Sequence, residues 1–82
     1  MYRVERWEYR DGEQGAETLP SLVSEWEDWA SGLEGFLTAL SESVNADGGV
    51  VASSVHLGMS SASAHVSDTW SGEEWELVLA LA

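Results

Sequence analysis

Residues 50–81, VVASSVHLGMSSASAHVSDTWSGEEWELVLAL, alternate apolar and polar side chains with the period of two that is typical of strands. If Ser60 and Ser61 form one two-residue turn, and Ser71 and Gly72 form the next, three successive strands place one set of side chains on a common face. A slip of one residue at either turn would break this agreement, so the pattern predicts a three-stranded antiparallel meander with that face buried. The set comprises Val51, Val55, Leu57, Met59, Ala62, Ala64, Val66, Asp68, Trp70, Trp75, Leu77, Leu79 and Leu81.

The segment before the meander, residues 18–44, has the spacing of an amphipathic helix of about 26 residues. Thr18 suits the N-cap, and Pro20 suits the first turn, where the missing N–H of proline costs nothing. Gly32 and Gly35 fall on the outer face, where they indicate either a bend or a place where the backbone of a partner approaches closely. One apolar stripe, with Trp29 and Phe36 on its flank, collects Leu19, Leu22, Val23, Trp26, Ala30, Leu33, Leu37, Leu40 and Val44.

An N-terminal strand completes the predicted fold. The stretch YRVERWEYR directs Tyr2 and Val4 to one side and Trp7 and Tyr9 to the other, and because both sets contain aromatic rings, the buried side stays open. We therefore expect one α+β domain spanning residues 1–82. Its first layer is the N-terminal strand and the three-stranded antiparallel meander, and its second layer is one long amphipathic helix, straight or bent.

The charge of the chain is strongly one-sided, with 15 Asp and Glu residues against three arginines, no lysine and a formal net charge of −12. Such a chain repels nucleic acid and anionic membrane surfaces and attracts a basic partner. Carboxylates at i, i+3 and i+4 on a helix lie about 5–6 Å apart. They can therefore crudely follow the phosphates of DNA, which carry one charge per about 3.4 Å on each strand. The residues expected to bind the partner are the helix carboxylates Glu25, Glu27, Asp28 and Glu34, the last-strand carboxylates Glu73, Glu74 and Glu76, and the aromatic anchor Trp29.

Catalytic, metal and cofactor sites are not expected. The chain has no cysteine, which excludes disulfides and thiolate metal sites. In the predicted register His56 and His65 face each other on the outer side of the sheet, but two imidazoles without a carboxylate beside them do not make a zinc site. The N-terminus lacks the apolar core of a signal peptide and no apolar run is long enough to span a bilayer, so a cytoplasmic protein is expected.

Three short motifs mark the strands of the C-terminal half: a late Val55 and His56, a closing Ser67 and Asp68, and an opening Trp75, Leu77 and Val78. Together they resemble the strand region of phage uracil-DNA glycosylase inhibitors, which are small acidic α+β proteins that imitate DNA. That family carries a second helix before its strands, for which this chain has no room. The resemblance implies a protein that binds a DNA-handling enzyme in place of DNA.

Charge and resemblance together favour a small non-enzymatic inhibitor that imitates nucleic acid and blocks the basic site of a nucleic-acid-handling protein. Phage anti-defence proteins, such as anti-CRISPR proteins and DNA glycosylase inhibitors, are the expected setting. Three alternatives stay open: an immunity protein that neutralises a nuclease toxin, a structural or assembly protein of a salt-loving organism, and an enzyme that uses His56 and His65. The flat Ser, Thr and Ala outer face of the sheet also offers a surface for a homodimer.

Overall fold

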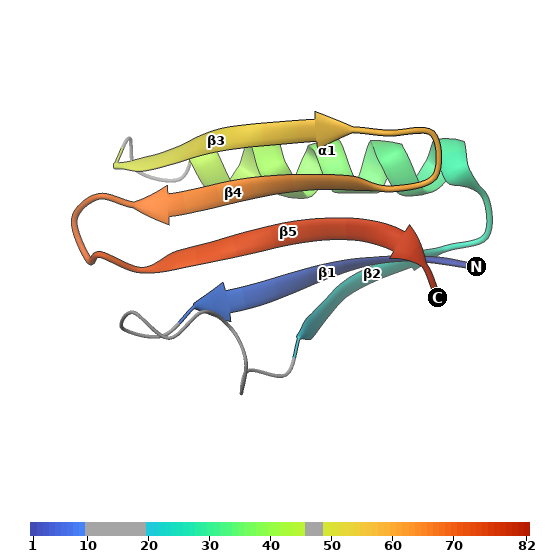
Figure 1. Ribbon diagram of the computed structural model, residues 1–82, viewed down its shortest axis with the longest axis horizontal. Helices are drawn as coiled ribbons and strands as arrows, with labels where there is room; N and C mark the ends of the chain where they lie inside the picture. Colours follow the sequence, from blue (N-terminus) through green and yellow to red (C-terminus); the bar gives the residue numbers. More distant parts are fainter. Residues whose placement is uncertain (10–19, 46–48) are drawn as a thin grey trace.

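The sheet is larger than the sequence predicts. The computed structural model describes residues 1–9, 20–45 and 49–82. Within these ranges it has five strands and one helix, namely β1 (Tyr2–Tyr9), β2 (Ser21–Trp26), α1 (Trp29–Asn45), β3 (Val50–Leu57), β4 (Ala62–Asp68) and β5 (Glu74–Leu81). The strands form one antiparallel sheet in the order β2-β1-β5-β4-β3, and α1 packs on one face (Figure 1). The predicted fold, with one long helix over an N-terminal strand and a three-stranded meander, is therefore wrong.

The buried faces of β4 and β5 are as their alternation predicts. The observed pair Ala62 and Leu79 differs by two residues from the predicted pair Ala64 and Leu79, and a slip of two keeps every side chain on its face. Val4 of β1 pairs with Leu79 and is fully buried, so the side of β1 that carries Tyr2 and Val4 faces the core. The predicted burial is confirmed for Ala62, Ala64, Val66, Trp75, Leu77 and Leu79.

The first part of the predicted helix is the strand β2. It pairs antiparallel with β1, Tyr2 lying opposite Trp26, so each strand satisfies backbone groups of the other. The helix begins at Trp29 because Asp28 caps it: the Asp28 carboxylate accepts the Ser31 N–H at 3.1 Å and the Ser31 hydroxyl at 2.9 Å. The predicted cap, Thr18, lies outside the described residues.

The helix presents a different face to the sheet from the one predicted. Gly32 and Gly35, predicted on the outer face, lie against the sheet. A Cβ on Gly32 would lie 3.1 Å from Leu79 Cδ1, and a Cβ on Gly35 would lie 2.5 Å from the Trp26 indole. Phe36, predicted on the flank of the stripe, is fully buried, whereas Leu37, predicted within the stripe, is 44% exposed. The predicted stripe took its phase from residues that belong to β2, and the two glycines instead let α1 approach the sheet closely.

The predicted pairing of β3 is wrong as well. Its hairpin to β4 closes at Leu57 and Ala62, so residues 58–61 form the connection, and Gly58 N–H donates to the Ser61 carbonyl at 2.8 Å. A bulge between Ser53 and His56, with Ser54 at φ 53°, then shifts the phase of the strand by one residue. Of the side chains predicted to be buried, this shift and the longer turns leave Val51, Val55, Leu57, Met59 and Trp70 exposed, and Leu81, the last residue of β5, is exposed as well.

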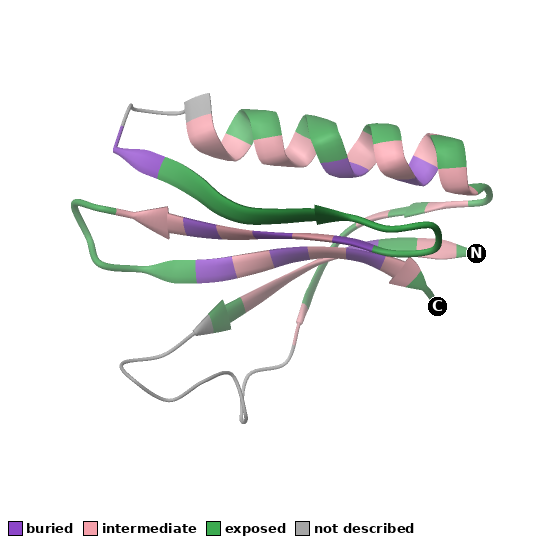
Figure 2. Cartoon of the chain, turned by 45° about the horizontal axis from the view of Figure 1, so that its top comes forward, coloured by how far each residue is buried: buried purple, intermediate pink, exposed green. Residues whose placement is uncertain are grey.

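The helix connects the two edge strands of the sheet. It follows β2, which is one edge strand, and precedes β3, which is the other (Figures 1 and 2). Buried residues alternate with partly exposed ones along β4 and β5, while β3 is exposed along nearly its whole length (Figure 2). The opposite face of the sheet is covered by no described element, so two surfaces are open: the bare sheet face and the margins of the helix.

Candidate functional site

The carboxylates of SEWEDWA are not on the helix, which corrects the prediction for three of them. Glu25 lies on β2, and its Oε2 is 2.9 Å from Arg3 Nε in an exposed ion pair. Glu27 and Asp28 lie in the bend between β2 and α1, and Asp28 is the helix cap. Of the predicted helix carboxylates only Glu34 lies on α1, where it is exposed.

The carboxylates of the last strand form a second group at a distance from the first. Glu74 and Glu76 lie on β5, Glu73 directly precedes it, and Glu74 Oε1 is 2.9 Å from His65 Nε2. Glu25 lies opposite Arg3, which lies opposite Ala80, so Glu25 is about 20 Å from Glu74 and about 14 Å from Glu76 along the strand direction. The structure therefore does not bring the predicted carboxylates together in one patch.

The aromatic anchor predicted at Trp29 is half-buried. Its ring meets Tyr2 edge to face, with centroids 5.6 Å apart and an angle of 64° between the ring planes. Trp29 also packs against the buried core. Its contacts are those of a residue that fixes the start of α1 to β1.

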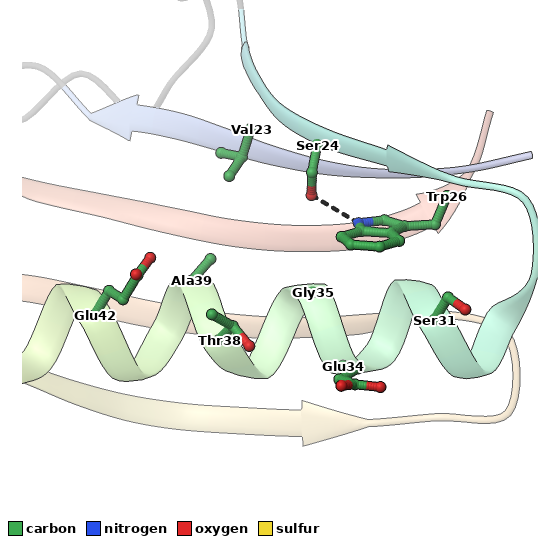
Figure 3. A pocket seen from close by; sticks show the side chains of 9 residues that line it. All are labelled: Val23, Ser24, Trp26, Ser31, Glu34, Gly35, Thr38, Ala39 and Glu42. Carbon is green, nitrogen blue, oxygen red and sulfur yellow. Dashed lines mark hydrogen bonds between the residues drawn. The ribbon is translucent and has the colours of Figure 1, made fainter.

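A groove between α1 and β2 has a volume of about 330 Å³. The Trp26 indole lies along it, held by a hydrogen bond that its Nε1–H donates to Ser24 Oγ at 2.7 Å (Figure 3). Gly35 leaves room for this ring. We call this feature the α1–β2 groove; its lining is Val23, Ser24, Trp26, Ser31, Glu34, Gly35, Thr38, Ala39 and Glu42.

A bulge in β2 shapes the strand side of the groove. Val4 pairs with Ser24 and Glu5 pairs with Leu22, so Val23 is an extra residue without a partner on β1. A bulge turns side chains of consecutive residues toward the same side, which accounts for Val23 and Ser24 both lining the groove.

The helix side of the groove carries two carboxylates. Glu34 and Glu42 are eight residues apart on α1, which is about 12 Å along a helix axis, with Thr38 between them. Neither has a cation partner among the described residues. The groove thus combines an indole and aliphatic floor with uncompensated negative charge at its margin.

The described cations are already engaged elsewhere. Arg3 pairs with Glu25, and Arg6 pairs with Glu8 at 3.1 Å while its guanidinium lies 4.1 Å from the centroid of the Trp75 ring. Carboxylates that form no ion pair with a described residue are Glu5, Glu27, Asp28, Glu34, Glu42, Asp68 and Glu73. Ion pairs within the chain therefore leave the acidic surface largely uncompensated.

Two aspartates serve as caps. Hydrogen bonds from the Ser31 N–H and hydroxyl lower the pKa of Asp28. The N–H groups of Trp70 and Ser71 lower the pKa of Asp68, whose Oδ1 accepts them at 2.9 Å and 3.3 Å. In both cases hydrogen-bond donors stabilise the ionised carboxylate. Asp28 does this at the start of α1, and Asp68 does it in the turn that follows β4.

The two histidines do not face each other, which corrects the predicted pair. His56 lies opposite Ser63, and His65 lies opposite Ser53. Among the described residues no group of three or more His, Asp or Glu side chains is placed to hold a metal ion. No helix in residues 20–45 is long and apolar enough to cross a membrane.

Sequence reasoning missed three residues that shape the surface. Trp26 and Glu42 line the groove, and Glu42 could have been found from its i+8 spacing to Glu34 once the start of the helix was known. Trp70, predicted to be buried, is 76% exposed and lies against Gly49, where an added Cβ would come within 3.0 Å of its ring. The turn that carries Trp70 gave no signal of this exposure.

No protein-family model, curated protein or solved structure matches the chain. The chemistry of its surfaces is therefore the basis for inferring what it binds.

Proposed function

We propose that this protein is a small acidic binding protein that occupies the basic, nucleic-acid-binding site of another protein. The observation that carries the proposal is the α1–β2 groove, where Glu42 and, at the outer margin, Glu34 line a site with the Trp26 indole and have no cation partner among the described residues (Figure 3). The formal net charge of −12 adds a long-range field of the same sign. A basic side chain of the partner supplies the missing cation.

Arginine and lysine fit both parts of the groove. Their aliphatic stems pack on apolar surface while the charged head reaches a carboxylate, and an arginine guanidinium also stacks on an indole face. The floor offers Trp26, Val23 and Ala39 for the stem, and Glu42 receives the head. Glu34, whose side chain points away from Trp26, receives a cation at the outer margin of the groove (Figure 3). Carboxylates and phosphates accept the same bidentate hydrogen bonds from arginine, so a site built for phosphates also accepts these groups.

The spacing of Glu34 and Glu42 determines which phosphates of a nucleic acid they can replace. A separation of about 12 Å along α1 equals three to four phosphates along one DNA strand. Glu34 and Glu42 thus replace separated phosphates rather than a continuous track. The resemblance of the C-terminal strands to uracil-DNA glycosylase inhibitors supports the same class of target. Glu27 and Glu73, which lack ion pairs among the described residues, contribute to the attraction from farther away.

The test is competition with nucleic acid. The immobilised protein captures its partner at low salt, and the association rate of the purified pair is measured at two salt concentrations, with and without DNA or RNA. We expect fast association that slows steeply as salt rises, and exclusion of nucleic acid from the complex. An association rate that ignores salt, or a ternary complex with nucleic acid still bound, would contradict the proposal.

A matched pair of variants locates the site. Glu34→Gln with Glu42→Gln should reduce the association rate and flatten its salt dependence. Glu25→Gln with Glu74→Gln changes the net charge equally but removes carboxylates that are already paired, so it should act more weakly. Circular dichroism at the same low salt serves as the control for folding. Unfolding there would favour adaptation to a salt-rich environment, in which carboxylate repulsion is screened.

A further inference from the structure

Strand β3 is the less protected edge of the sheet. It pairs only with β4 among the described strands, so the backbone groups on its other side have no strand partner. Such edges readily accept another strand unless charge, proline, a covering element or a bulge blocks them, and of these features β3 has only the bulge at Ser54. The other edge, β2, follows Pro20, carries Glu25 and has the α1–β2 groove beside it. The β2 edge is therefore better protected than the β3 edge against pairing with another strand.

The edge also lies in a segment without acidic or cationic side chains. Residues 49–67, GVVASSVHLGMSSASAHVS, contain no Asp, Glu, Lys or Arg, although the chain holds 15 acidic residues in total. Their only ionisable side chains are His56 and His65. We call residues 49–67 the neutral edge segment. Although the chain has a net charge of −12, the β3 edge of the sheet therefore carries no carboxylate of its own.

Apolar side chains are exposed on the same segment. Val51 is 48% exposed, Val55 46%, Leu57 59% and Met59 98%. Val51 lies on the face opposite the helix, since its neighbours Val50 and Ala52 pair with residues on the core side. Leu57 lies opposite the buried Ala62, on the helix side, so exposed apolar side chains lie on both sides of the β3 edge. Exposed apolar side chains gathered along one strand edge are typical of a protein contact.

From these observations we infer that β3 pairs with β3 of a second copy of the chain, antiparallel and across a two-fold axis. The pairing continues the antiparallel pattern of the sheet and places Val51 and Val55 of both copies near the axis. A two-fold contact uses the same surface on both copies and closes on itself, so it yields a dimer. In the dimer both β3 edges are paired, and the remaining edge β2 is protected by Pro20, Glu25 and the bulge at Val23, which opposes growth beyond two copies.

Charge identifies the occupant as a second copy. A basic protein is drawn to the carboxylates, and the neutral edge segment offers it none. Two copies repel each other through their acidic surfaces, and the orientation that brings the two neutral edge segments together keeps those surfaces farthest apart. Since like-charged chains approach more easily when the Debye length falls from about 10 Å at 0.1 M to about 3 Å at 1 M, the dimer strengthens with salt.

Sedimentation equilibrium of the full chain at several salt concentrations tests the inference. We expect a mass that rises from 8.9 kDa toward twice that value with protein concentration, and a dissociation constant that falls as salt increases. Val51→Glu with Val55→Glu places like charges across the axis and should raise the dissociation constant by roughly tenfold or more. Leu22→Glu, an equally exposed apolar site on β2, is the control and should leave the dimer intact.

Two results would overturn the inference. One is a mass of 8.9 kDa at every salt and protein concentration, with thermal unfolding confirming that the chain is folded. The other is a dimer that survives Val51→Glu with Val55→Glu but is lost with Leu22→Glu, which would move the contact to β2. Loss of binding to another protein by the β3 variants of a monomeric chain would assign the edge to that protein instead. Because the inference does not depend on the proposed function, neither result bears on the α1–β2 groove.

Discussion

Replacing Gly35 with alanine separates the observed fold from the predicted long helix by the sign of the change in stability. On an exposed helix face, Gly→Ala stabilises by about 0.8–1 kcal/mol, because alanine loses less backbone entropy. In the structure, a Cβ on Gly35 would lie 2.5 Å from Cε2 and Nε1 of Trp26. These atoms belong to a rigid ring that packs against the core, so either the ring or the helix must move.

The expected magnitude follows from three opposing contributions. Overpacking costs about 1–3 kcal/mol, and displacement of the ring breaks the Trp26–Ser24 hydrogen bond, which contributes about 0.5–1.5 kcal/mol. The helix propensity of alanine offsets about 1 kcal/mol of this. Gly35→Ala should therefore destabilise the fold by roughly 0.5–3.5 kcal/mol, with Tm falling by about 4–8 °C for each kcal/mol.

Urea unfolding followed by circular dichroism measures this change at fixed salt. The control is the same substitution in a Trp26→Ala background. Without the indole there is no ring to clash with, and Gly35→Ala should stabilise by up to about 1 kcal/mol. The difference between the two backgrounds gives the coupling between Gly35 and Trp26. An increase in stability in the wild-type background would refute the packing of β2 against α1.

Two further substitutions test the sheet and the helix cap. Leu79→Ala should destabilise by roughly 2–5 kcal/mol because the side chain is fully buried, whereas Val78→Ala on the bare face should cost far less; the reverse order in urea unfolding would show that the β5 register is wrong. Asp28→Ala should destabilise more than Glu27→Ala, since both remove one negative charge but only Asp28 accepts the Ser31 donors. The pKa of Asp28 lies below its usual 3.8, so the gap between these variants should be full above pH 3.8 and close as pH falls through the lowered pKa; a gap independent of pH would exclude a role for the ionised carboxylate.

The sequence predicts a part of the sheet well because two strands carry a strong alternating pattern. Ala64 and Val66 on β4, and Trp75 and Leu77 on β5, keep their buried face even though the observed register differs by two residues. An even slip preserves the phase of a strand, so an error in turn length does no harm there. In β3 the phase changes at Ser54, which takes a positive φ without being glycine or asparagine, and nothing in its sequence signals that change.

The sequence does contain an indication that the helix begins at Trp29 and not near Thr18. Asp28 followed by Ser31 is a capping arrangement, but the apolar spacing through Trp26 suggested that the helix was already under way. Whether residues 21–26 form a strand depends on pairing with β1, which is a long-range contact that local spacing does not encode. This one boundary moved Glu25, Glu27 and Asp28 off the helix, so the predicted acidic cluster fell with it.

The same boundary error concealed the groove, because a groove between α1 and β2 exists only if residues 21–26 are a strand. Its carboxylates and the neutral edge segment lie at opposite edges of the sheet, beside β2 and on β3. A basic protein in the groove therefore leaves β3 open to a second copy. The two contacts respond to salt in opposite directions, since screening weakens attraction to a basic site and relieves repulsion between two copies of charge −12. At an intermediate salt concentration a dimer would present two grooves to one array of basic sites, and binding through both would exceed binding through either alone.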